Sequence, residues 1–526
     1  MDFRDRAIAP LRAWIIKKKS TLGPLAGAIA VFWIISRLRA YITTSSNSTK
    51  LPSPRFALPY FGHIFHLGYD VIKTVSQWHE QYGPIITIQA GVKQVVIIAD
   101  PFIAHEVLGI KGSQTANRPY NKVITEIYSR NGRGMSVADV NTTSWKKSRA
   151  IAATFFGPSG VKKKLTDICN ETEKLVDLLA TENNVDPYPH LLRFALNYMM
   201  FSCFGKQTTS INDPLFKSAK HQVSYAKDLT KIKHMASGYL PVLSFIDSLL
   251  GREETIEKHI AARDSWTSAL MMEAYNDRKD CIATTLMDSV YAGEIDEMTA
   301  IVTVVDIIAG GMETTAVTMT WAFGILSVKP EIQRKIQKEL DHFIETHKRM
   351  PMFSEREQFP YMIAVQRECM RFRPTATIGL PHEAAEDIVW RNKIIPKGAM
   401  IVANMVAMHM NPEVYCDPHV FRPERFLDKT ETFTASARSK IEDRDQYNFG
   451  WGRRLCPGIY VAEVHMFSVF THVFARHTIV PRMDYKGSPV PLDLESFLPR
   501  RETTMIVATP PSYQVRFVPR TKHLVQ

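Results

Sequence analysis

The sequence predicts a mainly α-helical protein of the α+β class, with small peripheral β-sheets and no wide sheet at its centre. The longest apolar segment with helical periodicity spans residues 296–327, and a second helical segment follows at residues 330–347. Strand-like runs are short and lie at the two ends of the globular part. They cover residues 85–89, 94–98, 394–395, 400–403, 505–508 and 514–517.

The first two strand-like runs form a predicted hairpin. Both are rich in β-branched residues, and residues 90–93 between them contain Gly91, which suits a turn. The segment 330–347 is a predicted surface helix, because Pro330 can occupy its first turn and apolar residues recur at helical spacing. These residues are Ile332, Ile336, Leu340 and Phe343.

The segment 296–327 is long enough to cross the whole molecule as one helix. Gly310 and Gly311 lie in its middle, where each glycine costs about 1 kcal/mol relative to alanine. Thr314 follows Gly310 by four residues, so its hydroxyl can bond the Gly310 carbonyl oxygen. One interpretation is a glycine pair that serves packing alone. The other is a groove for a small ligand, in which Glu313 and Thr314 relay protons.

Composition and charge restrict the class of protein. The chain has 526 residues, 45% of them hydrophobic and 22% charged, which is typical of an ordinary globular protein with a large core. The net charge is +12, but the basic residues are dispersed and no nucleic-acid-binding motif accompanies them. An anionic membrane surface or an acidic protein partner therefore fits the charge better than a nucleic acid does.

Residues 21–36 form an uncharged, mostly apolar run with lysines before it and arginines after it. Sixteen helical residues reach about 24 Å, short of the roughly 30 Å hydrocarbon core, although flanking basic side chains can extend to the surface. We favour a membrane anchor over a cleaved signal peptide. The sequence thus divides into the anchor and its flanks (1–44), a polar and proline-rich connector (45–62) and one globular domain (63–526).

The six cysteines lie far apart and form no C-x-x-C pair, which argues against a disulfide framework or a zinc cluster. Cys456 differs from the others because glycines surround it at positions 450, 452 and 458 and Arg454 lies nearby. Backbone amides and positive charge would lower the pKa of its thiol, as a nucleophile or a metal ligand needs. The remaining interpretation is a buried free cysteine, which is the expectation for the other five.

The Cys456 loop carries a family resemblance. Residues 449–458 resemble, position by position, the F-x-x-G-x-R-x-C-x-G haem-binding loop of the cytochrome P450 monooxygenases. Four further motifs of that family occur in the expected order, and the resemblance covers residues 51–520. These motifs are Trp145-x-x-x-Arg149, residues 310–315, Glu368-x-x-Arg371 and residues 421–426.

The resemblance implies a triangular, helix-rich fold that holds haem b between the long central helix and the Cys456 loop. Cys456 would supply the axial thiolate, which favours O–O bond cleavage. Glu313 and Thr314 are similar to the family's acid–alcohol pair, which delivers protons. Residues similar to the family's contacts with haem and its propionates are Trp145, Arg149, His382, Phe449, Gly450 and Arg454.

Two further groups of residues follow from the resemblance alone. Glu368, Arg371 and Arg425 are similar to the buried ion-paired cluster that braces the haem loop, a structural role. Residues 500–503 and six single positions resemble segments that line the family's substrate pockets. Those six positions are Tyr120, Asp306, Ala309, Thr318, Thr375 and Ile378.

The activity implied is NADPH-dependent monooxygenation of a lipophilic small molecule, in secondary metabolism. The chain lacks a G-x-G-x-x-G fingerprint, so a separate NADPH–cytochrome P450 reductase would supply the electrons, with cytochrome b5 as an additional donor. One alternative is a haem-thiolate isomerase or dehydratase that consumes no dioxygen, against which Glu313 and Thr314 argue. The other is a noncatalytic haem sensor or electron carrier.

The implied location is the endoplasmic reticulum membrane, with the catalytic domain facing the cytosol. Three N-x-S/T sequons, at Asn47, Asn141 and Asn170, can test this topology. A cytosolic domain would leave Asn141 and Asn170 without glycan.

Overall fold

The computed structural model describes residues 49–68, 70–494 and 507–521. The predicted anchor at 21–36 and the predicted pocket residues 500–503 lie outside the described residues. The proposed boundaries at residues 44 and 62 therefore stay predictions.

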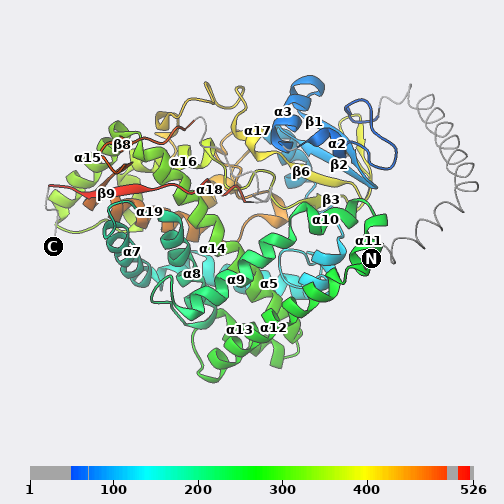
Figure 1. The fold of residues 1–526 in the computed structure, drawn as a ribbon, viewed down its shortest axis with the longest axis horizontal. Coiled ribbons are helices and arrows are strands. Elements are labelled where there is room, and N and C mark those ends of the chain that lie inside the picture. Colours follow the sequence, from blue (N-terminus) through cyan, green and yellow to red (C-terminus); the bar gives the residue numbers. More distant parts are fainter. Residues whose placement is uncertain (1–48, 69, 495–506, 522–526) are drawn as a thin grey trace, which may run out of the picture.

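The described chain forms a helix-rich body with a triangular outline, and the longest helix, α14, passes through its centre (Figure 1). Small sheets lie at the upper edges of this view, so the predicted mainly α class is confirmed. Its α-helices are α2 (Ile64–Leu67), α3 (Val71–Tyr82), α4 (Pro101–Ala104), α5 (Thr143–Phe156), α6 (Pro158–Lys162), α7 (Leu165–Ala180), α8 (Pro187–Phe204), α9 (Pro214–Leu229), α10 (Ile232–Tyr239), α11 (Val242–Leu249), α12 (Arg252–Asn276), α13 (Ile282–Tyr291), α14 (Glu297–Ser327), α15 (Pro330–His347), α16 (Pro360–Phe372), α17 (Met405–His409), α18 (Phe433–Arg438) and α19 (Ile459–Arg476).

Five shorter helical segments connect them. Two have π-helical hydrogen bonding, η1 (His105–Ile110) and η2 (Lys122–Tyr128), and three are 3₁₀ turns, η3 (Phe353–Gln358), η4 (Pro423–Phe426) and η5 (Gly452–Arg454).

Helix α14 forms where the apolar periodicity predicted it. Asp296 caps its start, because the carboxylate accepts a hydrogen bond from the Thr299 amide at 3.0 Å. Apolar residues on every side of α14 are buried, as expected of a helix in the core of a large domain. Within the described residues α14 is also the one helix long and apolar enough to span a membrane, but most of its apolar stretch is buried inside the protein. It is therefore a core helix.

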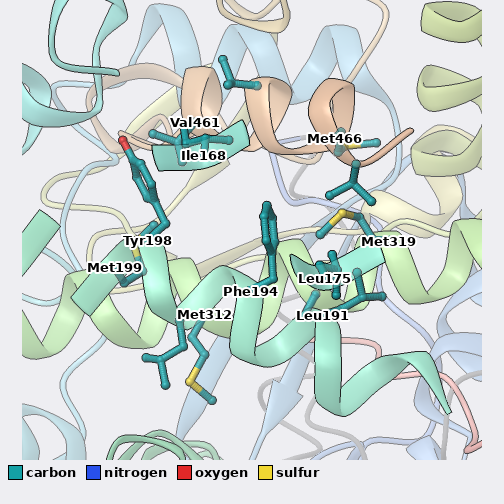
Figure 2. Packing of buried hydrophobic residues seen from close by; sticks show 14 of the residues in the cluster. Ile168, Leu175, Leu191, Phe194, Tyr198, Met199, Met312, Met319, Val461 and Met466 are labelled. Carbon is teal, nitrogen blue, oxygen red and sulfur yellow. The ribbon is translucent and has the colours of Figure 1, made fainter. Parts of the chain in front are cut away.

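The main hydrophobic core lies where α14 packs against α8, with α7 and α19 on the other side of α8. Figure 2 shows side chains from these four helices meeting, with Phe194 of α8 pointing toward α19. Helix α19 directly follows the Cys456 loop, so the core fixes the start of that helix and with it the end of the loop. Helix α15 has the predicted bounds and buries the predicted apolar residues.

The sheets are small. The predicted hairpin forms as β1 (Ile85–Ala90) and β2 (Lys93–Ile98), with a turn of two residues rather than the predicted four. Strand β6 (Met400–Ala403) adds parallel to β2, and β3 (His382–Glu383) adds antiparallel to β6. The other strands are β4 (Ile388–Trp390), β5 (Lys393–Ile395), β7 (His477–Met483), β8 (Pro489–Val490) and β9 (Val515–Pro519).

Only the end of the predicted strand 505–508 lies among the described residues, and neither residue 507 nor residue 508 belongs to a strand. The Ala508 amide donates instead to the Thr375 carbonyl at 2.8 Å, and the Ala508 carbonyl accepts from the Trp321 indole at 2.7 Å. This segment therefore crosses α14 instead of joining a sheet.

Candidate active site

One stripe of α14 is open although the helix is otherwise buried. Ala309, Gly310, Thr314 and Thr318 are at least partly exposed and recur at helical spacing. A Cβ atom added to Gly310 would meet nothing within 4 Å, whereas one added to Gly311 would lie 2.2 Å from the Met199 sulfur. Each of the two interpretations from the sequence, close packing and a groove for a ligand, therefore holds for one of the glycines. Gly311 allows α8 to approach, and Gly310 borders open space.

The predicted hydroxyl bond on α14 is confirmed. Thr314 Oγ1 donates to the Gly310 carbonyl oxygen at 2.7 Å, next to the open stripe. Thr318 continues this polar line, because its hydroxyl bonds the Thr314 carbonyl at 2.9 Å and the Thr375 hydroxyl at 2.6 Å. Two of the predicted pocket residues, Thr318 and Thr375, are therefore in direct contact along this line.

Glu313 lies beside Thr314 but is buried. Its Oε1 atom accepts from the Lys227 ammonium on α9, with which it forms an ion pair, and from the Tyr188 hydroxyl at 3.2 Å. The same Lys227 nitrogen bonds the Thr509 hydroxyl at 2.9 Å. The acid of the predicted acid–alcohol pair is thus tied to α9 and to the C-terminal segment.

The Cys456 loop is a tight turn held by its own backbone. The Cys456 amide donates to the Phe449 carbonyl at 2.9 Å, and Phe449 and Cys456 both pack against the main core. Gly452 has a φ of +57°, and a Cβ there would lie 2.5 Å from the Leu108 carbonyl oxygen of η1. Only glycine fits this position, because it tolerates both the left-handed backbone and the close approach.

Burial and two neighbouring groups act on the pKa of the Cys456 thiol in opposite directions. Burial raises the pKa of this thiol, although the Gly458 amide and Arg149 both act to lower it. Desolvation outweighs these two contacts because the thiolate loses its hydration where few groups replace it. Coordination to a metal cation would supply the missing stabilisation.

Three arginine side chains converge beside the loop. Arg149 of α5 donates to the Leu455 carbonyl oxygen. Arg454 donates to the Ala116 and Met135 carbonyl oxygens, each at 2.9 Å. Arg118 donates to the Leu380 and Pro381 carbonyl oxygens at 2.8 and 2.7 Å.

None of these three guanidinium groups forms an ion pair with a carboxylate in the part of the chain that the structure describes. Burial and the neighbouring Arg454 lower the pKa of Arg118 to about 9, and burial and Arg149 lower that of Arg454 to about 10. Buried cations without a counter-charge are costly, so this cluster is suited to an anionic ligand.

Trp145 and His382 border the same cluster. The Trp145 indole donates to the Met135 carbonyl at 3.1 Å, and Nδ1 of His382 lies 2.7 Å from the Thr115 carbonyl oxygen. Burial, followed by Arg118, lowers the pKa of His382 to about 3. His382 is therefore a neutral donor rather than a cation, and it is buried rather than on the surface.

The predicted ion-paired cluster is assembled behind the loop. Glu368 accepts from Arg371 Nε at 2.7 Å and Nη2 at 2.8 Å, and Arg425 Nε lies 3.2 Å from the same carboxylate. The Arg422 amide adds a hydrogen bond at 2.7 Å. Glu368 and Arg371 are fully buried, so each charge depends on its partners.

Two other predicted pocket residues have polar groups that are engaged elsewhere. The Tyr120 side chain is exposed, and its hydroxyl bonds Glu126 on η2. The Asp306 carboxylate accepts from the Met135 and Ser136 amides at 2.7 and 2.9 Å and from the Ser136 hydroxyl at 2.7 Å. Both Asp306 oxygens are therefore engaged, and this residue anchors the 134–136 segment rather than offering a handle to a substrate. Ile378 packs partly buried beside the β1–β2 sheet.

Sequence reasoning missed Arg118 and Lys227. Arg118 lies in a stretch without a recognised motif, and Lys227 lies on an amphipathic helix whose lysines suit a solvated face. No local pattern distinguishes them, since each acquires its role from residues more than eighty positions away.

Comparison with known proteins agrees with this geometry. The family model described as Cytochrome P450 matches residues 51–510. The chain is 27% identical over 520 residues to "Cytochrome P450 monooxygenase CYP3" of Mycosarcoma maydis, covering 95% of this chain and 92% of that protein. It is 24% identical over 513 residues to a 3-hydroxyphenylacetate 6-hydroxylase of Emericella nidulans, covering 95% and 94%.

A solved structure shares the fold. A zebra fish cytochrome P450 determined with abiraterone aligns with a TM-score of 0.68 at 24% identity, covering 86% of this chain and 100% of that one. The chain belongs to the cytochrome P450 family, and it is a haem-thiolate monooxygenase.

The residues present fit the family's cofactor. Haem b carries two propionate carboxylates and an iron that takes a cysteine thiolate. The cluster of Arg118, Arg149 and Arg454, in which no described carboxylate forms an ion pair with a guanidinium group, suits the propionates, and Cys456 lies in the loop that Arg149 bonds. The open stripe at Gly310 leaves room that a Cβ atom would occupy.

Proposed function

We propose that this protein inserts one atom of dioxygen into a lipophilic small molecule, with Cys456 as the axial thiolate and Arg118, Arg149 and Arg454 as propionate partners. When bound, haem with a thiolate ligand supplies the activation of dioxygen. The stoichiometry of this reaction requires two electrons from NADPH and two protons, which reduce the second oxygen atom to water. The observation that carries the proposal is the open stripe of α14, with the Thr314 hydroxyl beside Gly310.

The residues of α14 manage the protons in this proposal. The Thr314 hydroxyl lies at the open stripe, and Glu313 beside it reaches toward Lys227 and Tyr188. A proton can therefore pass from the α9 side through Glu313 to Thr314, which is a short path for general-acid transfer. An isomerase or dehydratase that consumes no dioxygen would not need such a path.

The test compares Thr314→Ala with Thr320→Ala. Thr320 lies on the same helix and bonds its own i−4 carbonyl at 2.7 Å, but it is buried away from the stripe. We expect Thr314→Ala to keep haem while NADPH electrons end as hydrogen peroxide instead of product. Thr320→Ala should keep product formation coupled to NADPH. Equal coupling in both variants would remove Thr314 from the mechanism.

We infer that electrons come from a separate NADPH–cytochrome P450 reductase, with cytochrome b5 as an additional donor. Arg453 and Lys146 lie at the surface near the Cys456 loop, and the Arg453 guanidinium donates to the Asn141 amide oxygen at 3.1 Å. This positive surface suits an acidic flavin domain. Replacing both residues with glutamate should lower the reduction rate most at low ionic strength. An unchanged rate at all salt concentrations would place the contact elsewhere.

We further propose a secondary-metabolic substrate and a location on the endoplasmic reticulum membrane. Exposed apolar side chains support a membrane-facing surface, since Phe56 and Phe65 are 83% and 63% exposed. Helix α11 lies beside this segment, because the Tyr60 hydroxyl accepts a hydrogen bond from the backbone amide of Val242, whose side chain is also exposed. The exposed Asn141 side chain tests the topology, because glycan on it would exclude a cytosolic domain.

Substrate and reaction class can be determined together. The gene is disabled in the source organism, both strains are grown under isotopically heavy dioxygen, and their extracts are compared by accurate mass. A lost product that carries heavy oxygen absent from an accumulating precursor supports monooxygenation and identifies the substrate. A pair of equal mass, or a pair that differs by water without label, supports the isomerase or dehydratase.

A further inference from the structure

A buried histidine lies between the ion-paired cluster and the Cys456 loop. His409 ends α17 and is fully buried. Its own carbonyl oxygen accepts from Arg371 Nη1 at 2.9 Å, so the cluster of Glu368, Arg371 and Arg425 holds its backbone directly. The His409 side chain points away from this cluster, toward Tyr447 in the segment that leads into the Cys456 loop.

Both ring nitrogens of His409 have backbone partners. Nδ1 lies 2.8 Å from the Met405 carbonyl oxygen, which can only accept, so Nδ1 must carry the proton. The Tyr447 amide lies 3.2 Å from Nε2 and can only donate, so Nε2 must be unprotonated. Both contacts therefore define one neutral tautomer. Burial, opposed by the Met405 bond, lowers the pKa of His409 to about 3, in agreement with this tautomer.

The hydrogen bonds continue from Tyr447 to Cys456. The Gly450 amide donates to the Tyr447 carbonyl at 3.1 Å, and the Cys456 amide donates to the Phe449 carbonyl at 2.9 Å. Arg444 holds the same turn from outside, because its Nη2 donates to the Gly450 carbonyl at 2.6 Å. The Tyr447 and Trp451 rings stack with an interplanar angle of 9°, so this turn has little freedom to shift.

We propose that the neutral imidazole of His409 is a positioning residue that fixes the Cys456 loop relative to the cluster of Glu368, Arg371 and Arg425. The path runs from Arg371 through the His409 backbone and ring to the Tyr447 amide, and from there through the Gly450 turn to Cys456. The inference rests on the proposed function, because it gives Cys456 the role of thiolate ligand. It adds a second connection to the loop besides the packing of α19.

Three single variants separate the hydrogen bond from simple burial. His409→Phe removes both ring bonds and keeps the volume of the ring. His409→Gln can return an amide oxygen to the Nε2 position and so accept from Tyr447. His465→Phe is the matched control, since His465 on α19 is equally buried but its ring nitrogens have no hydrogen-bond partner among the described residues.

Two measurements on the haem-loaded full chain follow. The first is the fraction of the ferrous carbon monoxide complex that shows the thiolate-ligated spectrum. The second is hydrogen exchange of the peptide that contains the Tyr447 amide. For His409→Phe we expect a loss of the thiolate-ligated fraction and about tenfold faster exchange, which corresponds to the loss of one buried hydrogen bond. His409→Gln should recover much of both, and His465→Phe should change neither.

The outcomes that would overturn the inference are distinct from failure of the proposed function. If the wild-type protein never shows the thiolate-ligated spectrum, the assignment of Cys456 fails. If the wild type shows it and His409→Phe matches His465→Phe in both measurements, the positioning role fails. If His409→Phe does not fold, His409→Gln is the deciding variant. A hydrogen-exchange rate and a thiolate-ligated fraction at the wild-type level in His409→Gln support the acceptor role. Loss of both contradicts it.

Discussion

The two sides of the open stripe are held in place by different kinds of interaction. Around the Cys456 loop the charges are buried and bond mostly to backbone carbonyl oxygens, as Arg444 does to Gly450 and Arg454 to Met135. On the side of α9, α12 and residues 118–136, ion pairs between partly exposed side chains connect the segments. Examples are Lys122 with Glu253 at 2.7 Å and Arg133 with Asp296 at 2.9 Å.

The difference shows which side can move. Exposed ion pairs contribute little and are weakened by salt, whereas a buried charge that loses its partner is strongly destabilising. The loop side is therefore built to stay in one arrangement. The side formed by α9, α12 and residues 118–136, which we call the cover, can break its exposed ion pairs at a small free-energy cost, while Glu313 and Asp306 hold it to α14.

The largest effect is expected from Glu368→Gln, which breaks the loop side. Removing this charge leaves Arg371 buried without its carboxylate, at about 3–5 kcal/mol. We expect little haem-loaded protein and a correspondingly lower free energy of unfolding, measured by haem content and denaturant titration. Glu424→Gln on the exposed side of η4 is the control. Normal haem content in Glu368→Gln would contradict the contrast between the two sides.

Glu463 tests the loop side through pH. This carboxyl is buried on α19, and burial raises its pKa from 4.5 to about 7, although Arg367 and Arg356 act to lower it. Between these values the folded protein holds a proton that the unfolded chain has released, so stability is lost as the pH rises through this range. The total is about 3 kcal/mol.

Glu463→Gln should remove that dependence. We expect the unfolding free energy of the variant minus that of wild type to increase from pH 5 to pH 8, measured by denaturant titration at each pH, because the opposite contributions of the buried His382 and His409 are the same in both proteins. The exposed Glu357 provides the control substitution Glu357→Gln. A constant difference between Glu463→Gln and wild type over this interval would show that Glu463 is already ionised there.

Asp306 lies where the two sides meet, and we expect an intermediate effect. Asp306→Ala leaves the Met135 and Ser136 amides without their acceptor, at about 1–3 kcal/mol. Hydrogen exchange should become faster in the 134–136 segment and stay unchanged around Tyr447. Asp306→Asn keeps one oxygen acceptor, so its exchange rate in this segment should lie between those of Asp306→Ala and wild type. Faster exchange at Tyr447 as well would mean that the two sides are not independent.

The smallest effect on stability is expected on the cover. Lys122 pairs with Glu253 of α12 at 2.7 Å, and both side chains are partly exposed. Lys122→Met should change the free energy of unfolding by about 1 kcal/mol or less. It should also make substrate binding less dependent on ionic strength, measured by spectral titration at several salt concentrations. Arg278→Met breaks an exposed pair elsewhere and should leave that dependence intact.

The central helix and the Cys456 loop could be predicted from the sequence because their signals are local. The apolar periodicity of α14, the cap at Asp296 and the glycines around Cys456 are all readable within a few turns of chain. The Glu368–Arg371 pair is also local, at i and i+3 on α16. Family resemblance then supplied Arg425 as its third member.

The remaining parts depend on contacts that no local pattern encodes. Arg118 and Lys227 look like ordinary surface cations until the fold buries one and pairs the other with Glu313. Asp306 was expected in the pocket because of its place on α14, but amides from a distant segment occupy its oxygens. The burial of Cys456, which raises the pKa of its thiol, depends on tertiary packing that the sequence does not show.

The adjacent glycines of α14 also bear on how such a chain can evolve. An alanine at position 310 would meet no atom of the protein and would improve the helix by about 1 kcal/mol. The chain has glycine here nevertheless, although Gly310→Ala is a single substitution that would stabilise the helix. Glycine at this position therefore keeps a volume the width of one methyl group open beside the stripe, at the expense of thermal tolerance. Gly310→Ala would exchange that volume for stability, and a ligand that fills the stripe would meet the added methyl group.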